Sequence, residues 1–178
     1  MKKIILGAVS ALMLSASSVK AGEYIPYVGF DYVNMTPNVS DLYPGNYDLG
    51  SLNAGVKLVD VGAIELFAER SAREKENTET GLARGRLYGL GADVLVNGWN
   101  FESGAILGSI GYGRMSARLK HNGITKKDTE NALRLGLGGE LNPTPEWGFR
   151  AMFRYSLANG DAYANSKEFS LGARYFFY

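Results

Sequence analysis

The last twelve residues of this 178-residue chain alternate between apolar and polar side chains with a period of two. Phe169, Leu171, Ala173, Tyr175 and Phe177 share one parity, whereas small and charged residues occupy most of the other. Successive side chains of a strand point to opposite faces, so this pattern predicts a β-strand with one apolar face. Aromatic residues end that face. The arrangement is typical of a strand in a lipid bilayer, which needs an apolar outer face and aromatic residues at the headgroup level.

The start of the chain predicts a secretory signal peptide. Lys2 and Lys3 form a positively charged beginning, residues 4–14 form a short apolar core, and Val19 and Ala21 stand before the predicted cleavage site. An apolar run of this length is too short to span a bilayer, which takes roughly twenty residues. We therefore expect residues 1–21 to be removed and residues 22–178 to form a single folded domain.

Composition excludes several classes of protein. After removal of residues 1–21 the chain keeps 16 basic residues against 18 acidic ones, a balance that argues against nucleic acid as a partner. The chain has no cysteine, so disulfides and a lipid-modified cysteine are both excluded.

Seven further segments repeat the alternation, so the sequence predicts eight strands, at roughly 24–33, 49–58, 64–71, 88–96, 101–118, 133–141, 147–156 and 167–178. The connections alternate in length, with long loops at 36–46, 72–84, 121–131 and 158–166 and short turns at 59–62, 97–98 and 142–146. Asn97 and Gly98 suit a two-residue hairpin turn, and a change of parity predicts a bulge near Gly108. Alternating long and short connections are typical of membrane barrels. We predict an all-β fold, an eight-stranded antiparallel up-and-down transmembrane β-barrel with both termini on the periplasmic side.

A soluble, lipocalin-type barrel would show the same alternation with its two faces exchanged. Aromatic residues near the strand ends argue against that exchange, because two aromatic girdles suit the two interfaces of a bilayer. One predicted girdle contains Tyr24, Trp147, Tyr175 and Phe177, and the other contains Tyr32, Tyr88, Tyr155 and Phe169.

With lipid outside, the predicted lumen receives a network of charged residues: Asp31, Lys57, Glu65, Glu69, Asp93, Arg134, Glu140, Arg150, Arg154 and Arg174. Charges of both signs in a narrow interior must pair, since an unpaired buried charge is very costly. An eight-stranded barrel is just wide enough to be filled by its side chains. We expect ion pairs that plug the lumen. The alternative is a narrow gated pore in which these charges set the selectivity.

The strand count, the size and the C-terminal strand resemble those of the small eight-stranded bacterial outer-membrane barrels, the OmpX, opacity-protein and OmpA-barrel group. This resemblance implies an integral protein of the outer membrane of a Gram-negative bacterium, with a role in surface interaction, adhesion or envelope integrity through four extracellular loops. A small porin-like channel is the alternative. We expect a monomer without a cofactor. Its expected partners are outer-membrane lipid and lipopolysaccharide, a host or surface ligand at the loops, and the barrel-assembly machinery at the C-terminal strand.

A lipid A-modifying enzyme is the second alternative, since some small outer-membrane barrels use a histidine with a serine or an acid. The single histidine, His121, has no serine two residues away and no positioned partner, so we expect no catalytic residue. One histidine, no cysteine and scattered carboxylates also predict no metal site. Basic residues near the third loop are placed to contact lipopolysaccharide phosphates, unless they form an ordinary solvated loop: Arg118, Lys120, Lys126 and Lys127.

Overall fold

The structure, a computed structural model, describes residues 24–38, 46–58, 61–72, 74–78, 81–121, 124–158 and 165–178. These residues form nine strands: β1 (Tyr24–Asn38), β2 (Tyr47–Leu58), β3 (Gly62–Ser71), β4 (Glu74–Thr78), β5 (Gly81–Phe101), β6 (Gly104–His121), β7 (Ile124–Leu141), β8 (Trp147–Ala158) and β9 (Asn165–Phe176). None of the described residues belongs to a helix long and apolar enough to cross a membrane. The expected signal peptide lies outside the described residues, and its removal stays a prediction.

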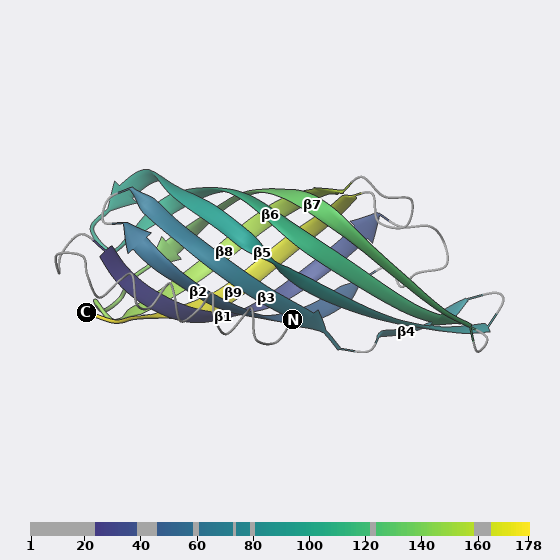
Figure 1. Cartoon of the computed structure of the whole chain (residues 1–178). Coiled ribbons are helices and arrows are strands. Elements are labelled where there is room, and N and C mark those ends of the chain that lie inside the picture. Colours follow the sequence, from purple (N-terminus) through teal and green to yellow (C-terminus); the bar gives the residue numbers. More distant parts are fainter. Residues whose placement is uncertain are drawn as a thin grey trace.

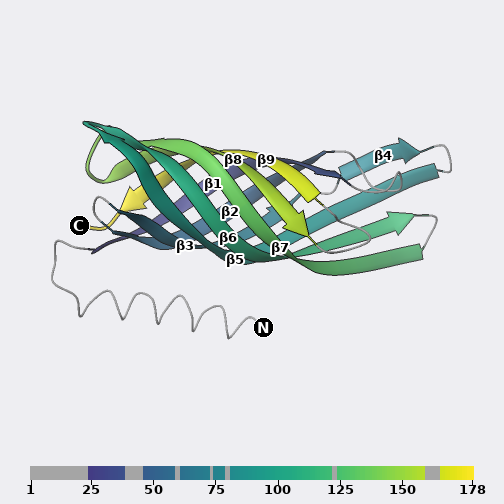
Figure 2. The same cartoon turned by 90° about the horizontal axis from the view of Figure 1, so that it is seen from above.

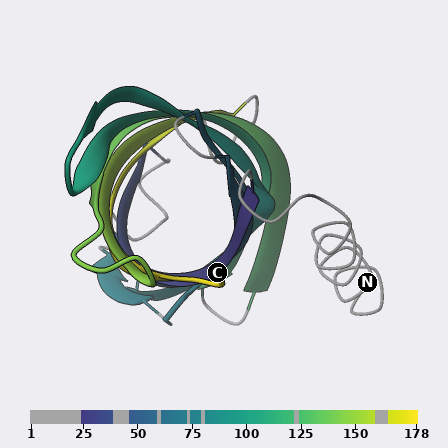
Figure 3. The same cartoon turned by 90° about the vertical axis from the view of Figure 1, so that its left-hand side faces the viewer.

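The strands form one antiparallel sheet that closes on itself (Figure 3). Its order is β3-β2-β1-β9-β8-β7-β6-β5-β4, and a further pairing of β3 with β5 closes the ring. β3 pairs with residues 88–96 of β5, and β4 pairs with residues 81–85 of the same strand. Because β4 continues the wall that β3 begins, the barrel has eight strands around its circumference. The predicted eight-stranded antiparallel barrel is confirmed.

The two ends of the barrel differ (Figures 1 and 2). The beginning of β1 and the end of β9 lie at one end, together with the β2–β3, β5–β6 and β7–β8 connections. At the other end the β4–β5 and β6–β7 hairpins project beyond the rest of the wall. The pairing of β6 with β7 runs up to His121 and Ile124, whereas the pairing of β7 with β8 begins only at Ala132 and Ala158. We call these two extensions the projecting hairpins.

The predicted loops at 72–84 and 121–131 are therefore wrong. The first contains β4 and the start of β5, and the second contains the first half of β7. Polar residues on both faces suggested irregular chain, but a strand outside a bilayer meets water on both faces and needs no apolar side. Of the other two predicted loops, β1 extends to Asn38 and β9 begins at Asn165, and residues 39–45 and 159–164 lie outside the described residues.

The predicted hairpin turn at Asn97 and Gly98 is also wrong. β5 continues to Phe101, which pairs with Gly104, and the chain turns between these two residues. The register shifts between Asn97 and Trp99, so Gly98 is the extra residue of a β-bulge. The predicted turn at 142–146 falls between strands. Of the predicted turn at 59–62, residues 59–60 lie outside the described part, Val61 lies between the strands and Gly62 begins β3.

The predicted bulge near Gly108 is likewise misplaced, because the irregularity lies in β5. In β6, Ala105 and Leu107 are buried, and the same parity stays buried or half-buried as far as Ala117. The two residues suggested a change of phase only because they are apolar side chains that face the lumen.

The two faces of the wall are those of a membrane barrel. Large apolar side chains lie on the outside, where Leu137 is 65% exposed, while Arg174 is 0% exposed on the inside. A soluble barrel would bury the leucine and expose the arginine. The lipocalin-type alternative is therefore excluded by the direction of these side chains.

Candidate functional site

A first group of charges lies in the lumen nearer the end that carries both termini of the barrel. Arg174 donates two hydrogen bonds to Asp31, and Arg150 Nη2 lies 2.7 Å from both carboxylate oxygens of Glu65. Arg174 Nε is 3.4 Å from Glu65 Oε2, which links the two pairs. The Tyr27 hydroxyl donates to the same oxygen over 2.8 Å. Two arginines and two carboxylates give this group no net charge, so burial leaves no charge uncompensated.

A second group surrounds Arg134. Its Nη2 donates to Glu168 over 2.9 Å, and its Nη1 lies 3.3 Å from Glu69 Oε1. Its guanidinium carbon also stacks 3.8 Å from the ring centre of Phe67. Arg134 therefore joins β7 to β3 and β9 at once. Ser156 adds a 2.7 Å hydrogen bond to Glu168.

Arg154 belongs to the second group as well. Its Nε lies 3.5 Å from Asp93 Oδ2, and its Nη1 donates to the hydroxyl of Ser170 over 3.0 Å. Glu168 was missing from the predicted network, although it shares the parity of Ser170 and Arg174 and that signal would have included it. With Glu168, three carboxylates face two arginines in this group.

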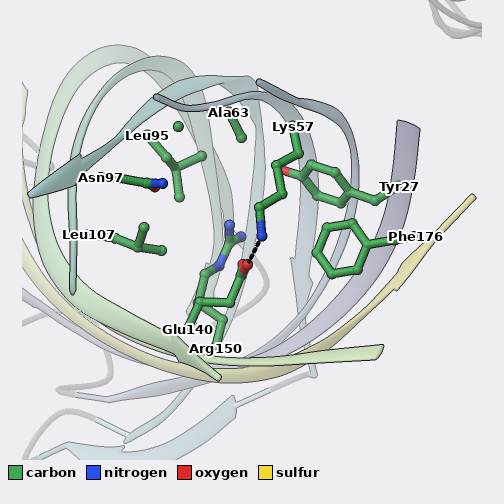
Figure 4. A pocket seen from close by; sticks show the side chains of 10 residues that line it. Tyr27, Lys57, Ala63, Leu95, Asn97, Leu107, Glu140, Arg150 and Phe176 are labelled. Atoms are coloured by element: carbon green, nitrogen blue, oxygen red, sulfur yellow. Dashed lines mark hydrogen bonds and ion pairs between the residues drawn. The ribbon is translucent and has the colours of Figure 1, made fainter. Parts of the chain in front are cut away.

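A third ion pair spans the lumen close to the termini (Figure 4). Lys57 Nζ lies 2.9 Å from Glu140 Oε1 and 4.8 Å from the ring centre of Phe176. The cavity beside this pair has a volume of about 10 Å³, lined by residues that include Leu95 and Leu107. Such a space holds about one water molecule.

Apolar side chains fill the lumen on both sides of the charges. The layer near the termini contains Tyr27, Ala63, Leu95, Ala105, Leu107, Met152 and Phe176. The layer near the projecting hairpins contains Val33, Met35, Tyr47, Leu49, Leu87, Met115, Ala117 and Ala132. The sequence analysis expected ion pairs that plug the lumen and did not name these apolar layers. They place the groups around Arg174 and Arg134 in the middle of the barrel, away from bulk water at either end.

Each of the ten residues predicted for the lumen points inward. Nine are buried, and Lys57 is half-buried at the mouth. They come from strands far apart in the sequence. Arg174 and Asp31, for example, are separated by 143 positions.

The predicted girdle residues lie on the outer surface. Six are exposed, and Tyr88 and Tyr155 are half-buried. At the terminal end, Tyr175 packs edge-on against Trp147 and Phe177, with ring centres 5.2 and 5.1 Å apart. Trp99 and Phe101, which the sequence analysis did not assign, are exposed on the end of β5.

The four basic residues proposed for lipopolysaccharide contact lie on the β6–β7 hairpin. Arg118 and Lys127 are exposed and pair directly across the two strands. Lys126 pairs with Leu119, one position out of phase with Lys127. The side chains of Lys120, His121 and Lys126 lie outside the described set. No group of three or more potential metal-binding side chains occurs among the residues that the structure describes.

Known proteins share this architecture. Residues 5–177 match the family described as the outer membrane protein beta-barrel domain. Neisserial surface protein A (NspA) has a similar structure, with a TM-score of 0.66 and 16% identity over 86% of this chain and 97% of that one. Ail of Yersinia pestis, solved in complex with the heparin analogue sucrose octasulfate, is similar as well. The TM-score is 0.59, and the identity is 17% over 87% of this chain and 98% of that one.

The N-terminal β-barrel domain of Pseudomonas aeruginosa OprF is also similar, with a TM-score of 0.55 and 14% identity over 85% of this chain and 97% of that one. At these identities the solved structures share the fold alone. No curated protein matches the sequence significantly. The family match, the outward apolar face and the closed eight-stranded ring agree with one another. The chain belongs to the outer membrane protein beta-barrel domain family and is a barrel of the bacterial outer membrane.

Proposed function

We propose that this protein is a non-enzymatic surface protein in which a closed barrel holds the projecting hairpins outside the cell. Its role is then surface interaction, adhesion or support of the envelope, and its contact surface is the hairpin end. The observation that carries the proposal is the length of the β6–β7 hairpin. Residues 124–131 of β7 extend past the last pair with β8, which corresponds to roughly 27 Å of strand.

The orientation of the barrel supports this role. An even number of strands leaves both ends of the barrel chain on one side, and an exported chain inserts from the periplasm. The projecting hairpins lie at the opposite end and therefore face the cell exterior (Figure 1). The extended β4–β7 sheet is not needed to close the barrel, since the ring already closes through β3 and β5.

The packing of side chains in the lumen favours a scaffold role over a channel role. The charged groups are paired with one another, and apolar layers lie on both sides of them. A water-filled path needs continuous polar space, and the cavity at the Lys57–Glu140 mouth holds about one water molecule.

The proposed partners follow from the exposed surfaces. Membrane lipid contacts the apolar wall, and lipopolysaccharide contacts the basic residues of the hairpins. A host or surface ligand meets the hairpin tips. The fold similarity to Ail, which was solved with a heparin analogue, supports a search among anionic ligands. Recognition of the β9 strand by the barrel-assembly machinery and a monomeric state remain part of the proposal.

Removal of the hairpins tests the proposal. Ser116 and Thr129 pair directly, and their hydroxyls lie 3.0 Å apart, so an Asn-Gly turn joining them replaces residues 117–128 with the shortest natural hairpin. The same turn between Glu74 and Gly85 replaces residues 75–84. Bacteria that display the full chain should bind epithelial cells or matrix proteins severalfold better than bacteria that display the trimmed chain.

Electrophoresis with and without boiling provides the control, because a closed barrel resists detergent until it is heated. Equal binding by the full and trimmed chains, both folded by this criterion, would overturn the assignment of contact to the hairpins. A change in the mass of lipid A that depends on the chain would contradict the non-enzymatic part of the proposal.

A further inference from the structure

A row of three cations crosses the outer face of the projecting hairpins. Arg86 of β5 pairs directly with Arg118 of β6, and Arg118 pairs directly with Lys127 of β7. Arg118 and Lys127 are exposed, and Arg86 is half-buried. Directly opposite side chains on neighbouring strands stand about 5 Å apart at Cβ, and like charges there repel. The row is therefore unfavourable unless a negative charge lies against it.

The protein supplies no such charge among the side chains that the structure describes. Within this described set, no ion pair joins Arg86, Arg118 or Lys127 to a carboxylate. The neighbouring positions of the same phase are apolar, polar or basic: Arg70, Tyr88, Leu90, Tyr112, Arg114, Ser116, Thr129, Asn131 and Leu133. Asp128 and Glu130 fall on the opposite phase of β7. Among the described side chains nothing neutralises the row, and an anion from outside the chain would do so.

Two further arginines lie on this face, between the row and the membrane. Arg70 is exposed and lies 5.5 Å from the ring centre of Tyr88, and Arg114 is exposed beside Leu90 and Asn131. We call the five residues Arg70, Arg86, Arg114, Arg118 and Lys127 the basic face.

The basic face continues the wall that contacts lipid. Tyr112 and Leu133 pair directly and are exposed in the apolar band, and the row of three lies six residues further along β6. Six residues span roughly 20 Å of strand, or roughly 15 Å of height at the usual tilt of barrel strands. The row therefore stands above the hydrocarbon, at the level of a tall headgroup. A phosphate linked directly to glycerol does not reach that height, whereas phosphates carried on a saccharide do.

We infer that Arg86, Arg118 and Lys127 form a binding site for the phosphate groups of a phosphorylated saccharide lipid in the outer leaflet. The planar guanidinium groups can each donate two parallel hydrogen bonds to a phosphate, and the lysine adds a point charge. One phosphate between neighbouring cations converts their repulsion into attraction. The inference rests on the proposed function for the external position of the hairpins and for their contact with lipopolysaccharide, and it requires no adhesion.

Retention of glycolipid by the purified full chain tests the inference. The chain is reconstituted in phosphatidylcholine vesicles that contain either a phosphorylated lipopolysaccharide with core sugars or the same material after chemical dephosphorylation. After detergent extraction at increasing salt, mass spectrometry counts the glycolipid kept by each barrel. We expect the wild-type chain to keep at least tenfold more of the phosphorylated form. High salt should remove this preference, since counterions compete for exposed charges.

The variant R86Q/R118Q/K127Q should lose the preference. Lys127→Gln alone should lower it severalfold, whereas Lys167→Gln, an exposed lysine on β9, should leave it unchanged. Electrophoresis with and without boiling shows whether each variant folds. If the triple variant does not fold, the inference is tested by comparing glycolipid retention in the Lys127→Gln and Lys167→Gln variants.

Equal retention by the triple variant would overturn the inference, as would equal loss in the Lys127→Gln and Lys167→Gln variants. Binding of soluble heparin without retention of the phosphorylated glycolipid would also overturn it and assign the row to a soluble polyanion. Loss of glycolipid retention with unchanged cell adhesion in R86Q/R118Q/K127Q separates this site from the proposed function.

Discussion

Arg174 of β9 and Asp31 of β1 form a two-pronged ion pair across the seam where the last strand meets the first. Nη1 lies 2.6 Å from Oδ1 and Nη2 lies 2.8 Å from Oδ2, and both side chains are buried. Each lies over a glycine of the facing strand, because Gly29 pairs with Arg174 and Gly172 pairs with Asp31. The seam of the barrel is therefore held by a charged pair as well as by the backbone ladder.

Replacement of Arg174 with Met should destabilise the barrel by about 3–5 kcal/mol, since it leaves Asp31 and Glu65 with less buried compensation. Unfolding by urea in lipid vesicles, followed by tryptophan fluorescence, measures this change. The D31N/R174M double variant should lose less than the sum of the two single variants, because the second change removes an already uncompensated charge. A loss below about 1 kcal/mol in the single variant would show that the pair is solvated.

The glycine that accommodates Asp31 should not tolerate a methyl group. A Cβ on Gly172 would clash with Asp31 Oδ1 and with the Phe30 carbonyl oxygen, whereas a Cβ on Gly108 would meet nothing within 4 Å. Gly172→Ala should therefore cost about 1–3 kcal/mol through overpacking, and Gly108→Ala should be nearly neutral. The same urea experiment compares the two. Equal effects would mean that the interior shifts freely to admit the methyl group.

Loss of the ring beneath Arg134 should weaken the second charged group. Phe67→Leu removes the stacking of this ring on the guanidinium and should cost about 2 kcal/mol, the range for a desolvated cation–π contact. Phe153→Leu, a change on the exposed lipid-facing surface, is the matched control and should cost less than about 1 kcal/mol because lipid fills the space. Similar unfolding midpoints for the two variants would argue that the stacking contributes little.

The wild-type barrel should produce no stepwise ion current in planar bilayers. Apolar layers on both sides of the charged groups leave no wide polar path among the described side chains. Lys57→Ala should behave in the same way, because it opens only the mouth. Regular current steps whose ion selectivity changes in Lys57→Glu would instead support the porin-like alternative.

Local alternation was sufficient to predict much of this protein. In β9, the parity of Leu171 and Arg174 already assigns one face to lipid and the other to the lumen, because side chains of a strand alternate whatever its partner. The same rule predicted eight strands and the direction of all ten lumen charges. The alternation rule depends only on neighbouring residues, so a single sequence is sufficient to apply it.

The pairing of those charges required the closed barrel. Nothing in the sequence assigns Arg174 to Asp31, or Arg134 to Glu69 and Glu168, since these contacts depend on the stagger between distant strands. The apolar layers escaped notice for a related reason, because Met35 and Leu107 are lumen residues whose chemistry resembles that of the lipid face. Alternation read in isolation therefore misplaced the bulge of β5.

The projecting hairpins mark the clearest boundary between what sequence and tertiary structure decide. Outside the bilayer both faces of a strand meet water, so residues 124–131 carry no apolar alternation and resemble a loop. Only the backbone pairing of β6 with β7 places Arg118 opposite Lys127, and only the pairing with β5 adds Arg86. The sequence alone determines the two faces of a strand such as β9, whose lumen side is polar, because burial imposes a local period. Register between strands is a property of the whole ring, and the tertiary structure alone decides it.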